Sequence, residues 1–198
     1  LCAEADRVLL LDAASGAPPI VNRAGLNPQN ITLDETGDTL AVATGESGDV
    51  LLLHAHTLSL LGRLPMPGMV YDVRLRNGSV HALCLNEAMA STLVTVQSCG
   101  VRQTLRLEGM PGVLAMCGET LLCATEGYLY VVSADGSRVL RTEKAAGRAD
   151  RMIFEKETWL LCDSLTENMV MRDCGGRWRL VCPNVRDMCA YFTREESS

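Results

Sequence analysis

Three aspartates, Asp72, Asp150 and Asp187, lie at related positions in a repeating sequence pattern. Carboxylates that converge on one point can bind a cation, or can share a proton and act as a catalytic pair. The alternative is that each aspartate caps a loop or pairs with an adjacent arginine, as Asp150-Arg151 and Arg186-Asp187 suggest. The predicted ligand-binding residues are these three aspartates together with Asn27, Asn30, Tyr71, Arg151 and Arg186.

No motif for catalysis or metal binding accompanies these carboxylates. The sequence has no Cys-x-x-Cys pair, no Gly-x-Ser-x-Gly elbow and no glycine-rich phosphate loop before a helix. His54 and His56 share one face of a strand or turn, because side chains alternate along a strand. No cysteine or carboxylate that could complete a metal site lies near them in the sequence. We therefore predict no catalytic residue, no metal and no cofactor.

Methionines mark a second candidate surface, formed by the segments that precede the first strand of each repeat. Met66, Met69 and Met110 lie in such segments, next to prolines that stiffen the loops. Flexible apolar side chains on a rigid rim suit an adaptable contact with a partner. The alternative is that these methionines plug the top of a central channel.

The elements that position these residues recur about every 40 residues. An apolar run, Leu121 to Thr125, has counterparts elsewhere, and the intervals from Val42 to Cys84 to Cys123 to Cys162 are 42, 39 and 39 residues. This period, combined with strand-like content, is typical of a β-propeller blade. A β-sandwich, whose strands also recur regularly, is the alternative.

Each repeat predicts four antiparallel strands. In the second repeat they are residues 70–75, 80–85, 92–96 and 102–107, and Asn77-Gly78 predicts a tight hairpin. We therefore expect an all-β fold, a five-bladed β-propeller whose blades are four-stranded antiparallel sheets. The single domain comprises repeats 27–66, 67–110, 111–148 and 149–185, and a closing blade made of 186–198 plus 1–26. Pairing of residues 188–192 with residues 1–5 closes the ring.

Part of the sequence resembles the YVTN-type propeller repeat family, which includes lactonase-like propellers. The resemblance is carried by Asp34 to Ala43 with Gly48 to Leu53, and by Arg7 to Gly16. In that family a "DG-x-x-L-Y-V" hairpin precedes a strand similar to "V-x-V-I-D-x-x-T-G". The resemblance implies a propeller fold, and lactone hydrolysis as one activity of the group.

Composition narrows the classes of partner. The net charge is -6 with a pI near 5.1, which argues against nucleic-acid binding. No apolar run is long enough to span a bilayer. The nine cysteines are predicted to be free thiols, which favours a cytoplasmic location, and export after removal of a leader is the alternative.

These observations predict a binding scaffold. We expect a non-enzymatic propeller that uses one face or its axial funnel to bind a protein or a small ligand. The alternative function is a hydrolase of the lactonase or glycosidase type that uses axial carboxylates.

Overall fold

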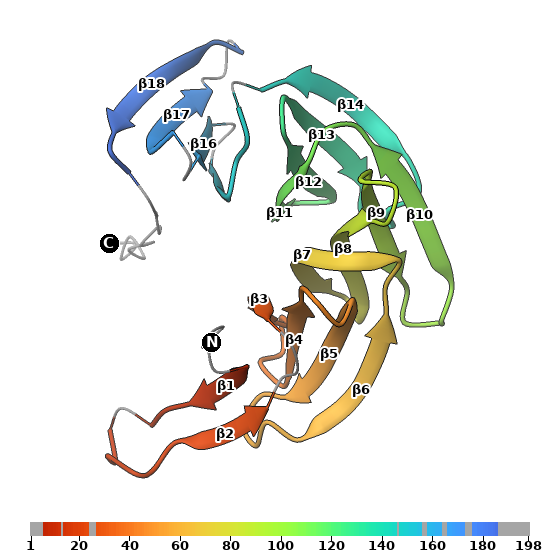
Figure 1. The fold of residues 1–198 in the computed structure, drawn as a ribbon, viewed down its shortest axis with the longest axis vertical. Coiled ribbons are helices and arrows are strands. Elements are labelled where there is room, and N and C mark those ends of the chain that lie inside the picture. Colours follow the sequence, from red (N-terminus) through yellow and green to blue (C-terminus); the bar gives the residue numbers. More distant parts are fainter. Residues whose placement is uncertain are drawn as a thin grey trace, which may run out of the picture. The chain divides into compact units, whose positions relative to one another are not determined.

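The fold was analysed in a computed structural model, which describes residues 6–12, 14–23, 27–145, 147–155, 158–163, 166–172 and 176–185 (Figure 1). The chain divides into two compact units, Leu1–Arg148 and Ala149–Ser198, and each is considered by itself. Within the described residues every regular element is a β-strand, and no helix is present that could cross a membrane. The predicted all-β class is confirmed.

The first unit contains three four-stranded antiparallel sheets and one hairpin. Blade 1 is formed by β3 (Pro28–Leu33), β4 (Thr39–Thr44), β5 (Asp49–His54) and β6 (Leu60–Pro65). Blade 2 is formed by β7 (Gly68–Arg76), β8 (Ser79–Asn86), β9 (Ser91–Val96) and β10 (Arg102–Leu107). Blade 3 is formed by β11 (Pro111–Cys117), β12 (Thr120–Thr125), β13 (Tyr128–Ser133) and β14 (Val139–Lys144). The hairpin pairs β1 (Arg7–Leu10) with β2 (Ile20–Arg23).

The second unit contains one further sheet of the same kind. Blade 4 is formed by β15 (Arg151–Glu155), β16 (Thr158–Asp163), β17 (Asn168–Arg172) and β18 (Trp178–Pro183). In all four blades consecutive strands pair in sequence order, so each blade is a simple meander. The prediction of four-stranded antiparallel sheets is confirmed for these four repeats.

The predicted fifth blade is described only in part. The hairpin β1–β2 lies beside blade 1, where Val8 joins a hydrophobic cluster with Val42 and Leu53. Residues 1–5 and 186–198, which are predicted to complete that blade and to close the ring, lie outside the described residues. Five blades and their closure therefore stay predictions.

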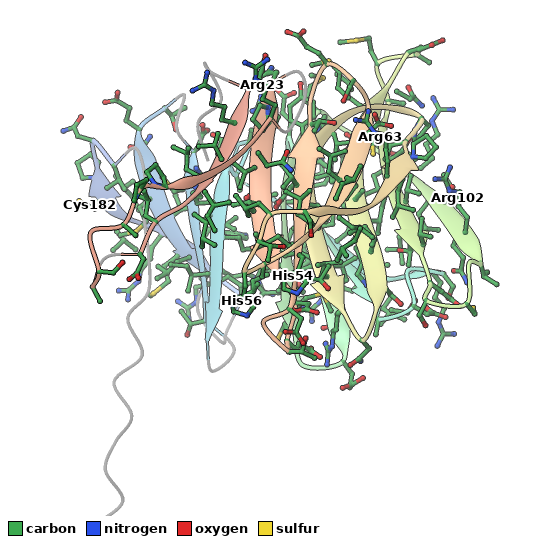
Figure 2. All side chains as sticks on the ribbon, turned by 90° about the horizontal axis from the view of Figure 1, so that it is seen from below. Arg23, His54, His56, Arg63, Arg102 and Cys182 are labelled. Atoms are coloured by element: carbon green, nitrogen blue, oxygen red, sulfur yellow. The ribbon has the colours of Figure 1, made fainter. Side chains whose placement is uncertain are left out.

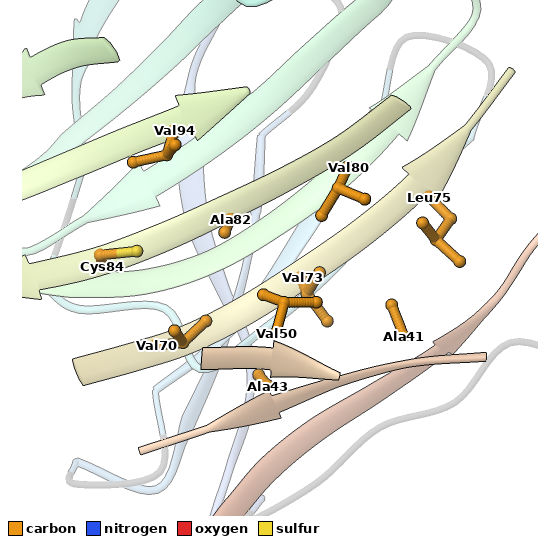
Figure 3. Close-up of a cluster of buried hydrophobic side chains, with 10 residues drawn as sticks. All are labelled: Ala41, Ala43, Val50, Val70, Val73, Leu75, Val80, Ala82, Cys84 and Val94. Carbon is orange, nitrogen blue, oxygen red and sulfur yellow. The ribbon is translucent and has the colours of Figure 1, made fainter. Parts of the chain in front are cut away.

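The second strands of blades 1 and 2 are buried on both faces, because each has a neighbour within the first unit on either side. In β4, Ala41 and Ala43 face blade 2 (Figure 3). Val42, between them, faces the β1–β2 hairpin. In β8, Ala82 faces blade 1 and Leu83 faces blade 3. Alternation along a strand thus sends successive apolar side chains into two different clusters. A continuous apolar run in the sequence is the expected signature of such a strand.

Cysteines fill small volumes in these clusters. Cys84 packs between blades 1 and 2, and Cys123 packs between blades 2 and 3. Burial raises the pKa of the Cys84 thiol to about 12 and also raises that of Cys123. All six cysteines that lie in the described part of the chain are free thiols: Cys84, Cys99, Cys117, Cys123, Cys162 and Cys182.

The predicted Asn-Gly hairpin between β7 and β8 is confirmed. Asn77 and Gly78 have φ angles of 48° and 70°, and Arg76 pairs with Ser79 across the turn. Two consecutive residues with positive φ define a type I′ turn, whose twist matches that of the flanking strands.

Candidate functional site

A register shift near the start of the first strand is shared by blades 1, 2 and 3. The pairing with the second strand skips one residue between Pro28 and Asn30, between Val70 and Asp72, and between Pro111 and Val113. A bulge of this kind re-aims the side chain that follows it. Asn30, Asp72 and Val113 therefore occupy equivalent positions in the three blades.

In blade 4 the equivalent position is held by Arg151. Arg151 stands four residues before Glu155 at the hairpin, as Asp72 stands four residues before Arg76. Asp150 thus corresponds to Tyr71, one residue earlier than the sequence pattern predicts. The correction matters because only one carboxylate, that of Asp72, occupies this position in the described blades.

Asp72 joins three consecutive blades. Its Oδ1 accepts hydrogen bonds from Asn30 Nδ2 of β3 and from Arg74 Nη1, the latter at 2.7 Å. The amide of Val73 donates to the same oxygen at 2.8 Å. Its Oδ2 accepts a hydrogen bond from the amide of Leu114 in β11 at 2.7 Å. One side chain of blade 2 therefore holds the first strands of blades 1 and 3.

The Asp72 carboxylate is almost completely removed from solvent, with 1% of its side chain exposed. Burial raises its pKa above the usual value for aspartate, because the charged form loses hydration. The Arg74 guanidinium and the amides of Leu114 and Val73 act in the opposite direction. Arg74 itself keeps about a quarter of its side chain exposed, at 24%.

This geometry favours a structural role for Asp72. Both carboxylate oxygens already have donors and only 1% of the side chain is exposed, so a cation or a substrate could reach the carboxylate only if the surrounding residues moved. The sequence alternative in which the aspartate pairs with a nearby arginine is realised here, although its partner is Arg74 and not an adjacent residue.

The other predicted ligand-binding residues are spread over several places. Asn27 has a φ of 56°, and its amide donates to Asp6 at 2.8 Å. Tyr71 is partly buried, and the Arg148 guanidinium carbon lies 5.9 Å from its ring centroid. Asp150 and Arg151 belong to the second unit. Arg186 and Asp187 lie outside the described residues, so convergence of the three aspartates stays a prediction.

The three predicted interaction methionines differ in exposure. Met69 is 41% exposed at the start of β7. Met66 packs against the hydrophobic cluster between blades 1 and 2, and Met110 is partly buried. Met69 is therefore the member of the set that a partner could reach most easily.

His54 and His56 lie close together but without the further side chains that a metal site needs among the described residues. The rings of His54 and His56 lie 5.8 Å apart, and the His56 amide donates to His54 Nδ1 at 3.2 Å. Over the described ranges, no three side chains among His, Cys, Asp and Glu gather in a way that could hold a metal ion.

Sequence reasoning missed Arg74 and the amide of Leu114. Arg74 follows Asp72 by two residues and so shares its face of β7, a signal that alternation alone could have revealed. The Leu114 amide carries no signal in the sequence, because every residue except proline has one. A second missed feature is the buried His81, whose Nδ1 lies 3.0 Å from Thr95 Oγ1.

We predict that His81 makes the fold sensitive to acid. Burial lowers its pKa from 6.5 to about 4, since the protonated ring loses hydration. Below pH 6.5 the unfolded state gains a proton that the folded state does not, so stability falls with pH until about pH 4. The expected loss between pH 7.5 and 4 is about 3 kcal/mol.

Urea unfolding of the wild type and of His81→Gln at several pH values measures this effect. The difference between the two curves isolates His81 from carboxylates that titrate in the same range. His56→Gln, which changes an exposed histidine, is the matched control and should follow the wild type. Parallel pH curves for wild type and His81→Gln would contradict the prediction.

Comparison with known proteins identifies the fold. No family model and no curated protein sequence matches the chain. The β-propeller domain of Myceliophteria thermophila Cps50 (Swd1) matches with a TM-score of 0.67 and 15% identity, over 89% of this chain and 65% of that one. BamB from Moraxella catarrhalis matches with a TM-score of 0.61 and 14% identity, over 80% and 51%. A nidogen/laminin complex matches with a TM-score of 0.65 and 12% identity, over 82% and 65%.

At such identities the likeness shows the fold alone. The chain has a β-propeller fold, as the repeat period predicts, and the more specific YVTN-type assignment is not confirmed. The chain spans between about half and two thirds of the length of these structures.

Proposed function

We propose that the protein is a β-propeller binding scaffold, without a catalytic role, that binds a partner protein through the rim carrying Met66, Met69 and Met110. The observation that carries the proposal is the use of Asp72 within the fold. The carboxylate of Asp72 accepts four hydrogen bonds from three blades. The Asp72 side chain therefore supports a rigid frame. A rigid binding surface loses little conformational entropy when a partner binds.

The rim supplies the contact surface in this proposal. Met69 is exposed and adaptable, and Pro67 stiffens the loop before it. One of the similar solved structures is itself a complex of two proteins, nidogen and laminin. By contrast, a hydrolase would need a carboxylate that is free to meet a substrate, and Asp72 is not free.

A photo-crosslinking residue placed at position 69 of the full chain tests the proposal inside cells. We expect a discrete crosslinked species from position 69 and none from position 140, an exposed apolar position on β14 used as control. Excess wild-type protein should compete for the partner, whereas the Met69→Glu variant should not. Equal crosslinking at both positions would contradict the rim as a binding surface.

Two further measurements test the proposal. The first distinguishes a methionine that contacts a partner from one that stabilises the fold, and the second distinguishes a binding scaffold from an enzyme. Met69→Glu should leave the melting temperature unchanged, whereas Met66→Glu should lower it, because Met66 packs against a buried cluster. Turnover of a panel of lactones and aryl glycosides that disappears in Asp72→Asn would favour the hydrolase instead.

A further inference from the structure

A groove with two arginines lies along β9 and β10 of blade 2, at the opposite edge of the sheet from β7, which carries Asp72. It has a volume of about 310 Å³ and is lined by Pro67, Asn86, Thr92, Val94, Arg102 and Arg106, with Thr104 between the arginines. Val94 belongs to the cluster between blades 1 and 2, so this face of the sheet looks toward blade 1. Contacts between these blades involve mainly β3, β4, β5 and β7, whereas the groove lies along β9 and β10.

Regular pairing of β10 puts the polar side chains of the groove on one face. β10 pairs with β9 without a register shift, whereas β6 and β14, the outer strands of blades 1 and 3, each contain one. Strict alternation therefore places Arg102, Thr104 and Arg106 on the same side of β10. All three residues are exposed.

These two arginines differ in their partners from those of the neighbouring outer strands. Arg63 of β6 is paired with Asp49 at 2.7 Å, and Arg141 of β14 is paired with Glu143 at 2.9 Å. Figure 2 labels Arg63 and Arg102. Arg102 instead donates to the backbone carbonyl of Pro65 at 2.5 Å. Within the described part of the chain neither Arg102 nor Arg106 forms an ion pair.

Guanidinium groups that have no acidic partner among the described residues and lie over a partly apolar floor favour the binding of carboxylates on an extended chain. Guanidinium binds carboxylate through charge-assisted hydrogen bonds, and the attraction is stronger where a wall excludes water. Buried Val94 and Thr92 form the floor between the arginines and the blade interior. A peptide strand fits such a groove well, because its alternate side chains can face the arginines while its backbone lies along the wall.

We propose that this groove, formed by Arg102, Thr104 and Arg106 above Val94 and Pro67, binds an extended acidic peptide segment of a partner protein. The groove is a second site, and its occupancy does not depend on binding at the methionine rim. The net charge of -6 disfavours general attraction of acidic chains, so binding of an acidic peptide would depend on local positive charge such as that of the two groove arginines.

Fluorescence anisotropy with a labelled peptide of alternating glutamate and valine tests the proposal on the full chain. We expect saturable binding that weakens with added salt and is absent for the matching peptide of alternating glutamine and valine. Arg102→Gln and Arg106→Gln should each weaken binding about tenfold, the loss expected for one charge-assisted hydrogen bond. Thr104→Glu, which retains both arginines, should weaken it at least as much.

Two control variants show whether the peptide binds at the groove, and not through the overall charge of the protein or at the methionine rim. The Arg63→Gln/Arg141→Gln double variant removes two positive charges, one more than either groove variant, from arginines that already have acidic partners, and should bind as the wild type does. Met69→Glu should also leave peptide binding unchanged, so failure of one proposed site does not imply failure of the other. Melting curves show whether each variant is folded.

Three results would overturn the proposal. The first is a dissociation constant for the acidic peptide weaker than about 1 mM. The second is an equal loss of binding in the Arg63→Gln/Arg141→Gln control. The third is tighter binding of a single-stranded oligonucleotide or of inorganic phosphate, which would assign the groove to phosphate.

Discussion

Replacing Asp72 with alanine is expected to lower the free energy of unfolding by about 3–5 kcal/mol, the usual cost of removing one partner of a buried ion pair. The substitution leaves Asn30, the Leu114 amide and the Arg74 guanidinium without their acceptor. Each buried donor without a partner then carries its own cost of lost hydration. Urea unfolding followed by circular dichroism measures the change.

Glu119→Ala is the matched control for Asp72→Ala. Glu119 also accepts from an arginine, Arg76 at 3.0 Å, but 88% of its side chain is exposed. Exposed ion pairs contribute between 0 and about 1 kcal/mol, so this variant should unfold almost as the wild type does. If the two variants unfold at the same urea concentration, Asp72 does not hold the blades together.

Gly109→Ala is expected to destabilise the protein by about 3 kcal/mol or more, through two causes that act together. Gly109 has a φ of 79°, a conformation that alanine adopts only with strain. A methyl group there would also overlap the backbone carbonyl oxygen of Glu126, which cannot turn away as a side chain can. Thermal and urea unfolding of the purified variant measure the effect.

Gly118→Ala separates the two causes. Gly118 has a φ of 51° but no atom within 4 Å of the position that a methyl group would take. Only the backbone strain applies there, so we expect a loss of about 1 kcal/mol. Equal losses for the two variants would mean that the segment around Glu126 moves to accommodate the added methyl group.

The strands of this protein could be predicted because the middle strands are buried on both faces. The run Leu121 to Ala124 is apolar without interruption, since Leu121 packs toward blade 2 while Leu122 points to the opposite face of its sheet. The ends of the strands could be predicted from residues that favour tight turns, as the Asn77-Gly78 turn illustrates. Strand content and order followed from such local signals.

The site was less predictable because it depends on register. A bulge shifts pairing by one residue, and the three residues at the bulge, Val70, Tyr71 and Asp72, include no glycine or proline that would reveal it. One residue was enough to make Asp150 look equivalent to Asp72. The groove was missed for another reason. The pairing of Arg63 with Asp49, and the lack of an acidic partner for Arg106 among the described residues, depend on neighbours in three dimensions.

The bridge that Asp72 forms also affects how the protein opens. Blades that are attached to their neighbours by apolar contacts alone can unfold one after another, as the repeats of repeat proteins do from the ends of the array. Here β3 and β11 share one carboxylate on β7, so releasing blade 2 also releases a buried donor on each side. Blades 1 to 3 thereby become a single cooperative unit, whose inner-strand amides exchange with solvent only in rare, concerted openings. The β1–β2 hairpin lies outside this bridge and is free to exchange earlier.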